Sequence, residues 1–225
     1  MELNKYIDHT NLKADATKED IRKLCDEAIK YHFASVCVNP CYVELANDLL
    51  KDSNVEITTV VGFPLGANNL RVKEYETIVA IESGADEIDM VVNIGALKDK
   101  DYDYIKEEIE TIRDILEGRV LKVIIETCYL TEEEIIKMTE ICNETFVNFI
   151  KTSTGFGTHG ATLEDLKIIN EHKNEILEIK ASGGIKDLKT AEAMVAAGAT
   201  RLGTSNSVKI MTEEIKHSCC EKESE

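Results

Sequence analysis

The sequence lacks the features that mark membrane, secreted or disordered chains. No run reaches the roughly 18 apolar residues that a membrane-spanning helix needs. The first residues, MELNK, show neither the basic start nor the apolar stretch of a secretory signal. Only 2 prolines and 12 glycines occur in 225 residues, so the composition has no bias toward disorder. We therefore expect an ordered cytoplasmic protein that has no membrane partner.

Several patterns that carry chemistry are also missing. The five histidines show neither H-x-H nor H-E-x-x-H spacing, so no metal site is expected and a metal-dependent reaction is poorly supported. The net charge of −17 repels polyanions, which disfavours nucleic acid as a partner. A small phosphorylated ligand is compatible with this net charge, because backbone N–H groups and one or two lysines can make a locally positive pocket. The seven scattered cysteines, an odd number, indicate reduced thiols.

Eight short apolar segments alternate with longer segments of helical period. The predicted strands are 5–8, 34–38, 57–62, 87–93, 121–126, 149–152, 177–181 and 201–204, and the predicted helices are 17–31, 41–51, 70–83, 101–116, 132–142, 163–173 and 187–197. Repeated strand–helix order predicts a parallel sheet. A Rossmann-type sheet is the competitor, but no G-x-G-x-x-G follows the first strand. We predict a single (β/α)₈ TIM barrel over residues 1–215, followed by a polar, flexible tail at 216–225.

Three charged residues interrupt or close predicted strands: Asp89, Lys151 and Lys180. Catalytic residues of barrels lie near the carboxyl ends of strands, and a period of two lets all three side chains point inward. One interpretation is an internal salt bridge. The other is a lysine nucleophile, whose pKa is lowered by burial and by a second ammonium until the neutral amine can attack a carbonyl. The residues alone leave both interpretations open.

The segment FIKTSTGF at 149–156 resembles the Schiff-base segment of class I deoxyribose-phosphate aldolases. Other segments of that family recur in the expected order from about residue 3 to about residue 210. They are IDHT at 7–10, VCVNP at 36–40, VVGFPLG at 60–66, GADEIDM at 84–90, LKVIIET at 121–127, KASGGI at 180–185 and GATRLGTS at 198–205. So extended a match identifies the chain as a member of this family.

The resemblance implies a reaction and a set of roles. The reaction is reversible cleavage of 2-deoxy-D-ribose 5-phosphate into D-glyceraldehyde 3-phosphate and acetaldehyde. Lys151 would form the imine, Lys180 would tune its pKa, and Asp89 would move protons through an ordered water. The imine serves as the electron sink, so neither a metal nor another cofactor is required. A homodimer or homotetramer is implied as well.

For the substrate phosphate we predict glycine-rich loops after the last three strands, where barrels often bind phosphate. The candidate residues are Gly155, Gly183, Gly184, Gly203, Thr204 and Ser205. The pair Gly183-Gly184 could also simply provide positive φ for a tight turn. Of the other polar strand residues, Asp8 is expected to line the pocket and Cys37 to pack in its apolar strand. Glu126 is expected to hydrogen-bond in the polar interior or to pair with a lysine.

The chain departs from the family pattern in two places. The C-terminal tyrosine that some members use for proton transfer is absent, because the sequence ends CCEKESE. Asn206-Ser207 replaces a smaller pair after the GTS segment, which bears on phosphate affinity.

Two other functions on the same barrel would compete with the aldolase hypothesis, and each would give a different experimental result. A non-covalent phosphosugar isomerase would resist borohydride trapping, and a sugar-phosphate binder would not cleave its ligand.

Overall fold

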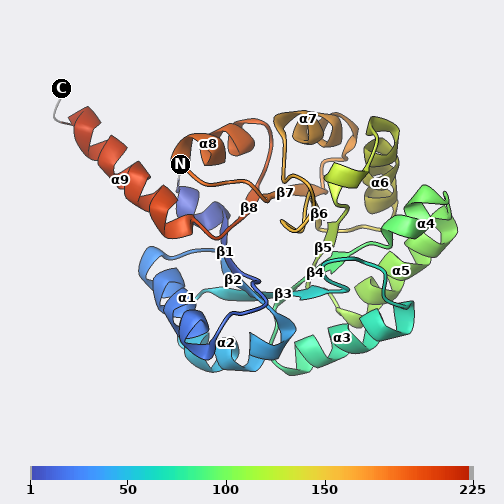
Figure 1. Ribbon diagram of the computed structural model, residues 1–225, viewed down its shortest axis with the longest axis horizontal. Helices are drawn as coiled ribbons and strands as arrows, with labels where there is room; N and C mark the ends of the chain where they lie inside the picture. The colour runs from blue at the N-terminus through green and yellow to red at the C-terminus, as the bar shows by residue number, and fades with distance from the viewer. Residues whose placement is uncertain (1, 223–225) are drawn as a thin grey trace.

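The computed structural model describes residues 2–222 and contains a closed barrel of eight parallel strands. The strands follow one another around the ring, and β8 pairs back with β1. They are β1 (Ile7–Asn11), β2 (Ser35–Val38), β3 (Glu56–Val61), β4 (Glu87–Val91), β5 (Val120–Ile124), β6 (Phe149–Lys151), β7 (Glu178–Ser182) and β8 (Arg201–Thr204). Figure 1 shows the strands as the inner ring and the helices outside it. The predicted (β/α)₈ barrel is confirmed.

The long helices form where the sequence supplies caps and helical period. They are α1 (Lys18–Tyr31), α2 (Val43–Leu50), α3 (Leu70–Glu82), α5 (Tyr102–Ile115), α6 (Glu132–Glu144), α7 (Leu163–His172), α8 (Leu188–Ala196) and α9 (Ser207–Lys222). Capping boxes from Thr17, Thr131 and Thr162 open α1, α6 and α7. No helix within residues 2–222 is long and apolar enough to cross a membrane.

Some short elements and one helix end differ from the predicted pattern. The 3-10 helices η1 (Leu3–Tyr6) and η2 (Pro40–Tyr42) overlap the strand predicted at 5–8 and the helix predicted at 41–51. The 3-10 helix η3 (Thr127–Tyr129) and the five-residue α4 (Ile94–Lys98) lie where no element was predicted. Helix α9 continues to Lys222, through most of the segment predicted as a tail, and Figure 1 shows it extending outward from the ring. The end of that segment, 223–225, lies outside the described residues.

Alternation along the strands separates an apolar layer from a charged interior. In β5, Leu121 and Val123 belong to the core that packs between strands and helices, and Lys122 between them is fully buried in an ion-pair cluster. In β7, Ile179 and Ala181 likewise flank the buried Lys180. Since neighbouring strand residues point to opposite faces of a sheet, these lysines lie inside the barrel.

Candidate active site

Asp89 lies at the centre of the charged cluster inside the barrel. Its Oδ2 atom accepts hydrogen bonds from Lys151 Nζ at 2.8 Å and from Lys180 Nζ at 2.7 Å. The side chain of Lys151 is 3% exposed, and those of the other two are fully buried. Lys151 and Lys180 are register partners on β6 and β7. The structure therefore brings together the three residues that the sequence indicated as the reacting group.

The two lysines have opposite pKa shifts. Burial lowers the pKa of Lys151, Asp89 opposes this effect, and the positive charge of Lys180 adds to it. Burial also disfavours the charged form of Lys180, but the carboxylates of Asp8 and Asp89 outweigh burial and raise its pKa. The geometry thus favours a neutral amine on Lys151 beside a permanent ammonium on Lys180.

Four further charged residues continue the cluster toward the amino-terminal end of the barrel. Lys122 Nζ donates to Asp89 Oδ1 at 2.9 Å and to Glu87 Oε2 at 2.5 Å. Arg201 Nη1 donates to Asp8 Oδ1 at 2.8 Å, and its distance to Glu87 Oε2 is 3.2 Å. Asp8 also accepts from Lys180. Sequence analysis missed Lys122, Glu87 and Arg201.

The formal charges of this network balance only when Lys151 is neutral. The three cations are Lys122, Lys180 and Arg201, and the three anions are Asp8, Glu87 and Asp89. A protonated Lys151 would add a seventh, uncompensated charge inside the barrel, where an unpaired charge is costly. Charge balance therefore supports the direction of the Lys151 pKa shift. Asp89 is ionised in this network. Burial by itself would raise the pKa of Asp89, but the surrounding lysines hold that pKa well below its ordinary value.

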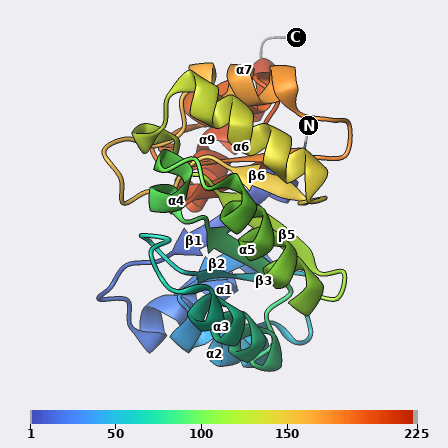
Figure 2. The same cartoon turned by 90° about the vertical axis from the view of Figure 1, so that its right-hand side faces the viewer.

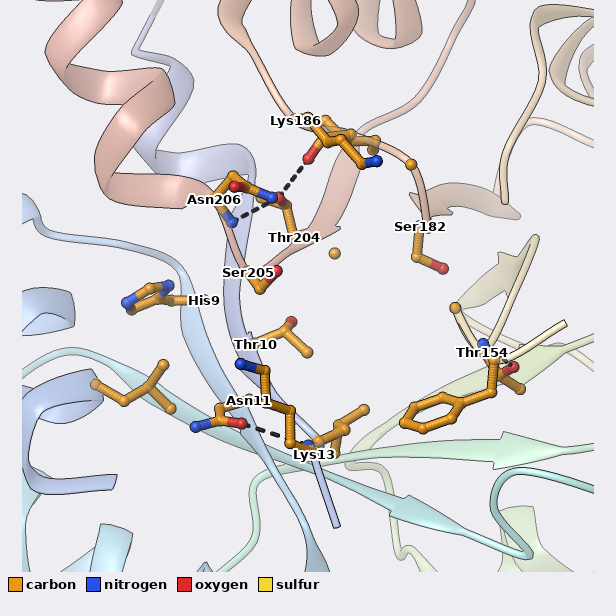
Figure 3. A pocket seen from close by; sticks show the side chains of 18 of the residues that line it. His9, Thr10, Asn11, Lys13, Thr154, Ser182, Lys186, Thr204, Ser205 and Asn206 are labelled. Carbon is orange, nitrogen blue, oxygen red and sulfur yellow. Dashed lines mark hydrogen bonds between the residues drawn. The ribbon is translucent and has the colours of Figure 1, made fainter. Parts of the chain in front are cut away.

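Lys151 opens into a cavity of about 500 Å³ at the carboxyl ends of the strands. Figure 3 shows His9, Thr10 and Asn11 of β1 on one side of this space and Thr154 and Ser182 on another. The predicted phosphate residues all line it: Gly155, Gly183, Gly184, Gly203, Thr204 and Ser205. Asp89 and Lys180 do not reach the cavity wall and lie beneath Lys151. The reacting amine and the glycine-rich loops therefore share one space.

Two of these glycines leave little room for a side chain, for different reasons. Gly183 has φ +78°, and a Cβ there would lie 2.9 Å from Gly160 Cα. Gly203 lies on β8, where a Cβ would lie 3.0 Å from Ser182 Cβ and 3.2 Å from Lys180 Cε. Gly183 thus provides the positive-φ turn considered from the sequence and also lines the cavity, so the two roles coincide.

Glu126 fixes the loop that follows Lys151. Its carboxylate accepts a hydrogen bond from the Thr154 backbone N–H at 3.1 Å and another from the Thr154 hydroxyl. Phe156 N–H donates to Thr154 Oγ1 at 3.0 Å. Glu126 has left-handed backbone angles (φ 53°), unusual for a residue other than glycine. It is 2% exposed and makes no ion pair with any lysine that the structure describes, so the hydrogen-bonding interpretation of Glu126 holds.

Cys37 and His9 border the site without joining the charged cluster. Cys37 packs with Leu12 and Val60 in a small apolar group, as expected, and burial raises the pKa of its thiol. His9 was missed in sequence analysis, where it appeared only within a family segment. Its Nδ1 atom lies 2.9 Å from Ser207 Oγ and its Nε2 atom 2.8 Å from Glu27 Oε2. His9 thereby ties β1 to α1 and to the start of α9, next to the loop of residues 204–206.

A model of DeoC/LacD family aldolases matches residues 3–209. The chain belongs to this family of aldolases. A deoxyribose-phosphate aldolase of Finegoldia magna is 56% identical over 211 residues, which are 94% of this chain and 99% of that protein. Among solved structures, one described as QR15, an aldolase, superposes with a TM-score of 0.93 at 42% identity and covers 97% of this chain and 98% of its own. The family resemblance seen in the sequence is confirmed.

A more distant relative bears on assembly. The deoxyribose phosphate aldolase from Aeropyrum pernix, described as a unique tetrameric structure, has a TM-score of 0.88 and 31% identity, covering 93% of this chain and 89% of its own. These likenesses make our chain an aldolase, a carbon–carbon lyase, and do not favour the alternative of a non-covalent isomerase.

Proposed function

We propose that this aldolase reversibly cleaves 2-deoxy-D-ribose 5-phosphate into D-glyceraldehyde 3-phosphate and acetaldehyde, through a Schiff base on Lys151. The observation that carries the proposal is a lysine of lowered pKa at the base of the cavity, in contact with an ionised aspartate. An amine kept neutral by its surroundings is what attack on an aldehyde requires.

The reaction follows from these positions. Neutral Lys151 attacks the substrate aldehyde carbon, and loss of water gives a protonated imine. The imine draws the electrons of the C2–C3 bond when the C3 hydroxyl loses its proton, which releases glyceraldehyde 3-phosphate and leaves an enamine. Protonation of the enamine carbon and hydrolysis then free acetaldehyde. Asp89, whose Oδ2 lies 2.8 Å from Lys151 Nζ, accepts and returns protons at that nitrogen, directly or through a water.

The substrate phosphate is proposed to bind at the loops after β6, β7 and β8. Backbone N–H groups of Gly155, Gly183, Gly184 and the 203–205 segment are the donors, and Lys186, which also lines the cavity, adds positive charge. Such a local field compensates for the acidic surface of the chain. The backbone of Asn206 helps to hold the loop after β8 in place, because its N–H donates to Thr204 Oγ1 at 3.0 Å.

The buried cysteines and the tetrameric relative support a proposal for where this aldolase works and how it assembles. The buried Cys25, Cys37 and Cys142 are free thiols, which suits the reducing cytoplasm. We propose that the aldolase works as a homodimer or homotetramer, by analogy with the tetrameric relative from Aeropyrum pernix.

Borohydride reduction tests the covalent step. Intact-protein mass is measured after treatment with and without deoxyribose 5-phosphate, for wild type, Lys151→Ala and Lys23→Ala. Lys23 also lines the cavity, so it controls for non-specific labelling of an exposed lysine. We expect a substrate-dependent adduct that Lys23→Ala keeps and Lys151→Ala loses. An active, folded wild type without an adduct would refute the Schiff-base mechanism.

A further inference from the structure

His9 lies between two helices of the outer layer. Asp8 before it on β1 points into the barrel, so His9 points outward, toward the helices. Figures 1 and 2 show β1 between α1 and α9, and these two helices contact each other. The imidazole is 4% exposed and packs on the ring of Phe33, with the ring centroids 5.1 Å apart. The His9 ring is therefore held in one orientation.

Both ring nitrogens of His9 have a hydrogen-bond partner. The Nε2 atom lies 2.8 Å from Glu27 Oε2 on α1, and the Nδ1 atom lies 2.9 Å from Oγ of Ser207, the first residue of α9. Ser207 is fully buried, and its Oγ atom is also 3.1 Å from the Thr204 carbonyl oxygen. A line of hydrogen-bonded groups thus connects α1, through β1, to the turn Thr204–Ser207 that follows β8.

A count of protons shows which group donates along this line. Burial lowers the pKa of His9, Glu27 opposes this effect, and the positive charge of Lys23 adds to it, so the imidazole is neutral at neutral pH. A neutral imidazole has a single N–H, and the Glu27 carboxylate accepts it from Nε2, which leaves Nδ1 as an acceptor. The one hydroxyl proton of Ser207 is then shared by Nδ1 and the Thr204 carbonyl. Ser207 therefore joins His9 to the turn.

The same turn belongs to the proposed phosphate site. Ser205 at its tip is exposed and lines the cavity, and Figure 3 shows His9 near Thr204, Ser205 and Asn206 at one end of that space. On one side, Thr204 Oγ1 donates to the Ile185 carbonyl at 2.7 Å, which ties the turn to the loop after β7. On the other side, Ser207 ties it to His9. This second attachment depends on Ser207, which is one of the two residues where the chain departs from the family pattern after the GTS segment.

We propose that His9 is a positioning residue for the phosphate end of the substrate, acting through Ser207 on the turn Thr204–Ser207. The inference rests on the phosphate site of the proposed function and not on the imine chemistry of Lys151. Among the described residues, the His9 ring hydrogen-bonds with Glu27 and Ser207 and not with the charged cluster. Its contribution is therefore to the affinity for phosphorylated ligands, and it leaves the chemical step unchanged.

The first test compares Ser207→Ala with wild type in the cleavage of deoxyribose 5-phosphate. KM should rise on the order of 10-fold, as for one lost hydrogen bond, while kcat stays within about 2-fold. The rate of borohydride trapping with acetaldehyde, which carries no phosphate, should equal that of wild type. Thr212→Ala is the matched control, because the Thr212 hydroxyl also donates to a carbonyl of α9, that of Val208 at 2.7 Å, but is exposed. It should keep the wild-type KM.

Two substitutions of His9 separate its two hydrogen bonds. Asparagine places its amide oxygen near the position of Nδ1 and keeps an acceptor for Ser207, whereas glutamine places its amide nitrogen near Nε2 and keeps a donor for Glu27. His9→Gln should therefore reproduce the KM increase of Ser207→Ala, and His9→Asn should restore part of it. The double variant of His9→Gln with Ser207→Ala should bind no more weakly than the weaker single variant. Ser207→Ala removes a single oxygen and decides the question if the His9 variants do not fold.

Calorimetric titration with inorganic phosphate separates this inference from the proposed function. Ser207→Ala should weaken phosphate binding, and Thr212→Ala should not. An unchanged KM and phosphate affinity in Ser207→Ala, an equal loss in acetaldehyde trapping, or a His9→Asn variant as weak as His9→Gln would overturn the inference. Wild type that binds phosphate but does not cleave deoxyribose 5-phosphate would refute the proposed function, and the phosphate titrations of the variants would still decide the role of His9.

Discussion

Removing the charge of Lys180 should make Lys151 a poorer nucleophile at neutral pH. Both Nζ atoms bond Asp89 Oδ2, at 2.7 and 2.8 Å, so they are at most 5.5 Å apart, the sum of these distances. At an effective dielectric constant of about 20, two unit charges at that separation repel by about 3 kcal/mol. Lys180→Gln removes this repulsion and should lower the neutral fraction of Lys151 on the order of 100-fold at neutral pH.

The sign of the pH effect follows from the direction of the pKa shift. The ammonium of Lys180 lowers the pKa of Lys151, so its loss raises that pKa. The rising limb of kcat/KM against pH should therefore move to higher pH, and activity should recover partly as pH increases. The rate of borohydride trapping with acetaldehyde should follow the same profile.

Lys122→Gln is the matched control for this experiment. Lys122 is also fully buried and also bonds Asp89, but through Oδ1, away from Lys151. Its loss should cost similar stability, about 3–5 kcal/mol, and move the pH profile less. Circular dichroism must first show that both variants are folded. A rising limb that stays in place or moves to lower pH in Lys180→Gln would refute the tuning role.

Three further substitutions probe other parts of the structure. Gly183→Ala should raise KM and lower the free energy of unfolding by about 1–3 kcal/mol, because φ is +78° and the new Cβ would meet Gly160. Unchanged kinetics would contradict the inference that this turn needs a glycine. Lys73 and Glu108 form a buried ion pair, so Lys73→Met should lower the free energy of unfolding in urea by about 3–5 kcal/mol, because it leaves Glu108 buried without its cation. The double variant Lys73→Met with Glu108→Leu should recover most of this loss, and additive losses would argue against a coupled pair. Glu126→Ala should raise KM more than it lowers kcat, because the loop after Lys151 loses the hydrogen bonds that hold it. Glu126→Gln should partly restore KM. An effect on stability alone would mean that the carboxylate does not position substrate.

The sequence predicted most strands because their apolar, β-branched runs are visible without knowledge of partners. The first strand was misplaced to 5–8, whereas β1 is Ile7–Asn11. Its last three residues, His9, Thr10 and Asn11, are polar and line the cavity, so an apolar criterion ends the strand too early. The additional helix α4 is only five residues long, too short for a periodic pattern to reveal.

The candidate site was predicted only in part, for a related reason. Asp89, Lys151 and Lys180 were found as charges within apolar strands, and Lys122 shows the same signal within LKVII but was not singled out. Arg201 begins β8 and looks like an ordinary polar flank. Its role depends on the closure of β8 against β1, which brings it to Asp8, 193 residues away in the sequence.

The buried charge network also limits how this barrel can vary. The six charges balance as a group, and each has at least one buried partner of opposite sign, so a single neutral substitution leaves the network with one uncompensated buried charge, at a cost of about 3–5 kcal/mol. That is a large part of the 5–15 kcal/mol that stabilises a typical domain. Changes at these positions should therefore occur in opposite-charge pairs during divergence. Libraries aimed at new aldehydes should leave the network intact and vary residues that line the cavity outside the proposed phosphate loops, such as Thr10.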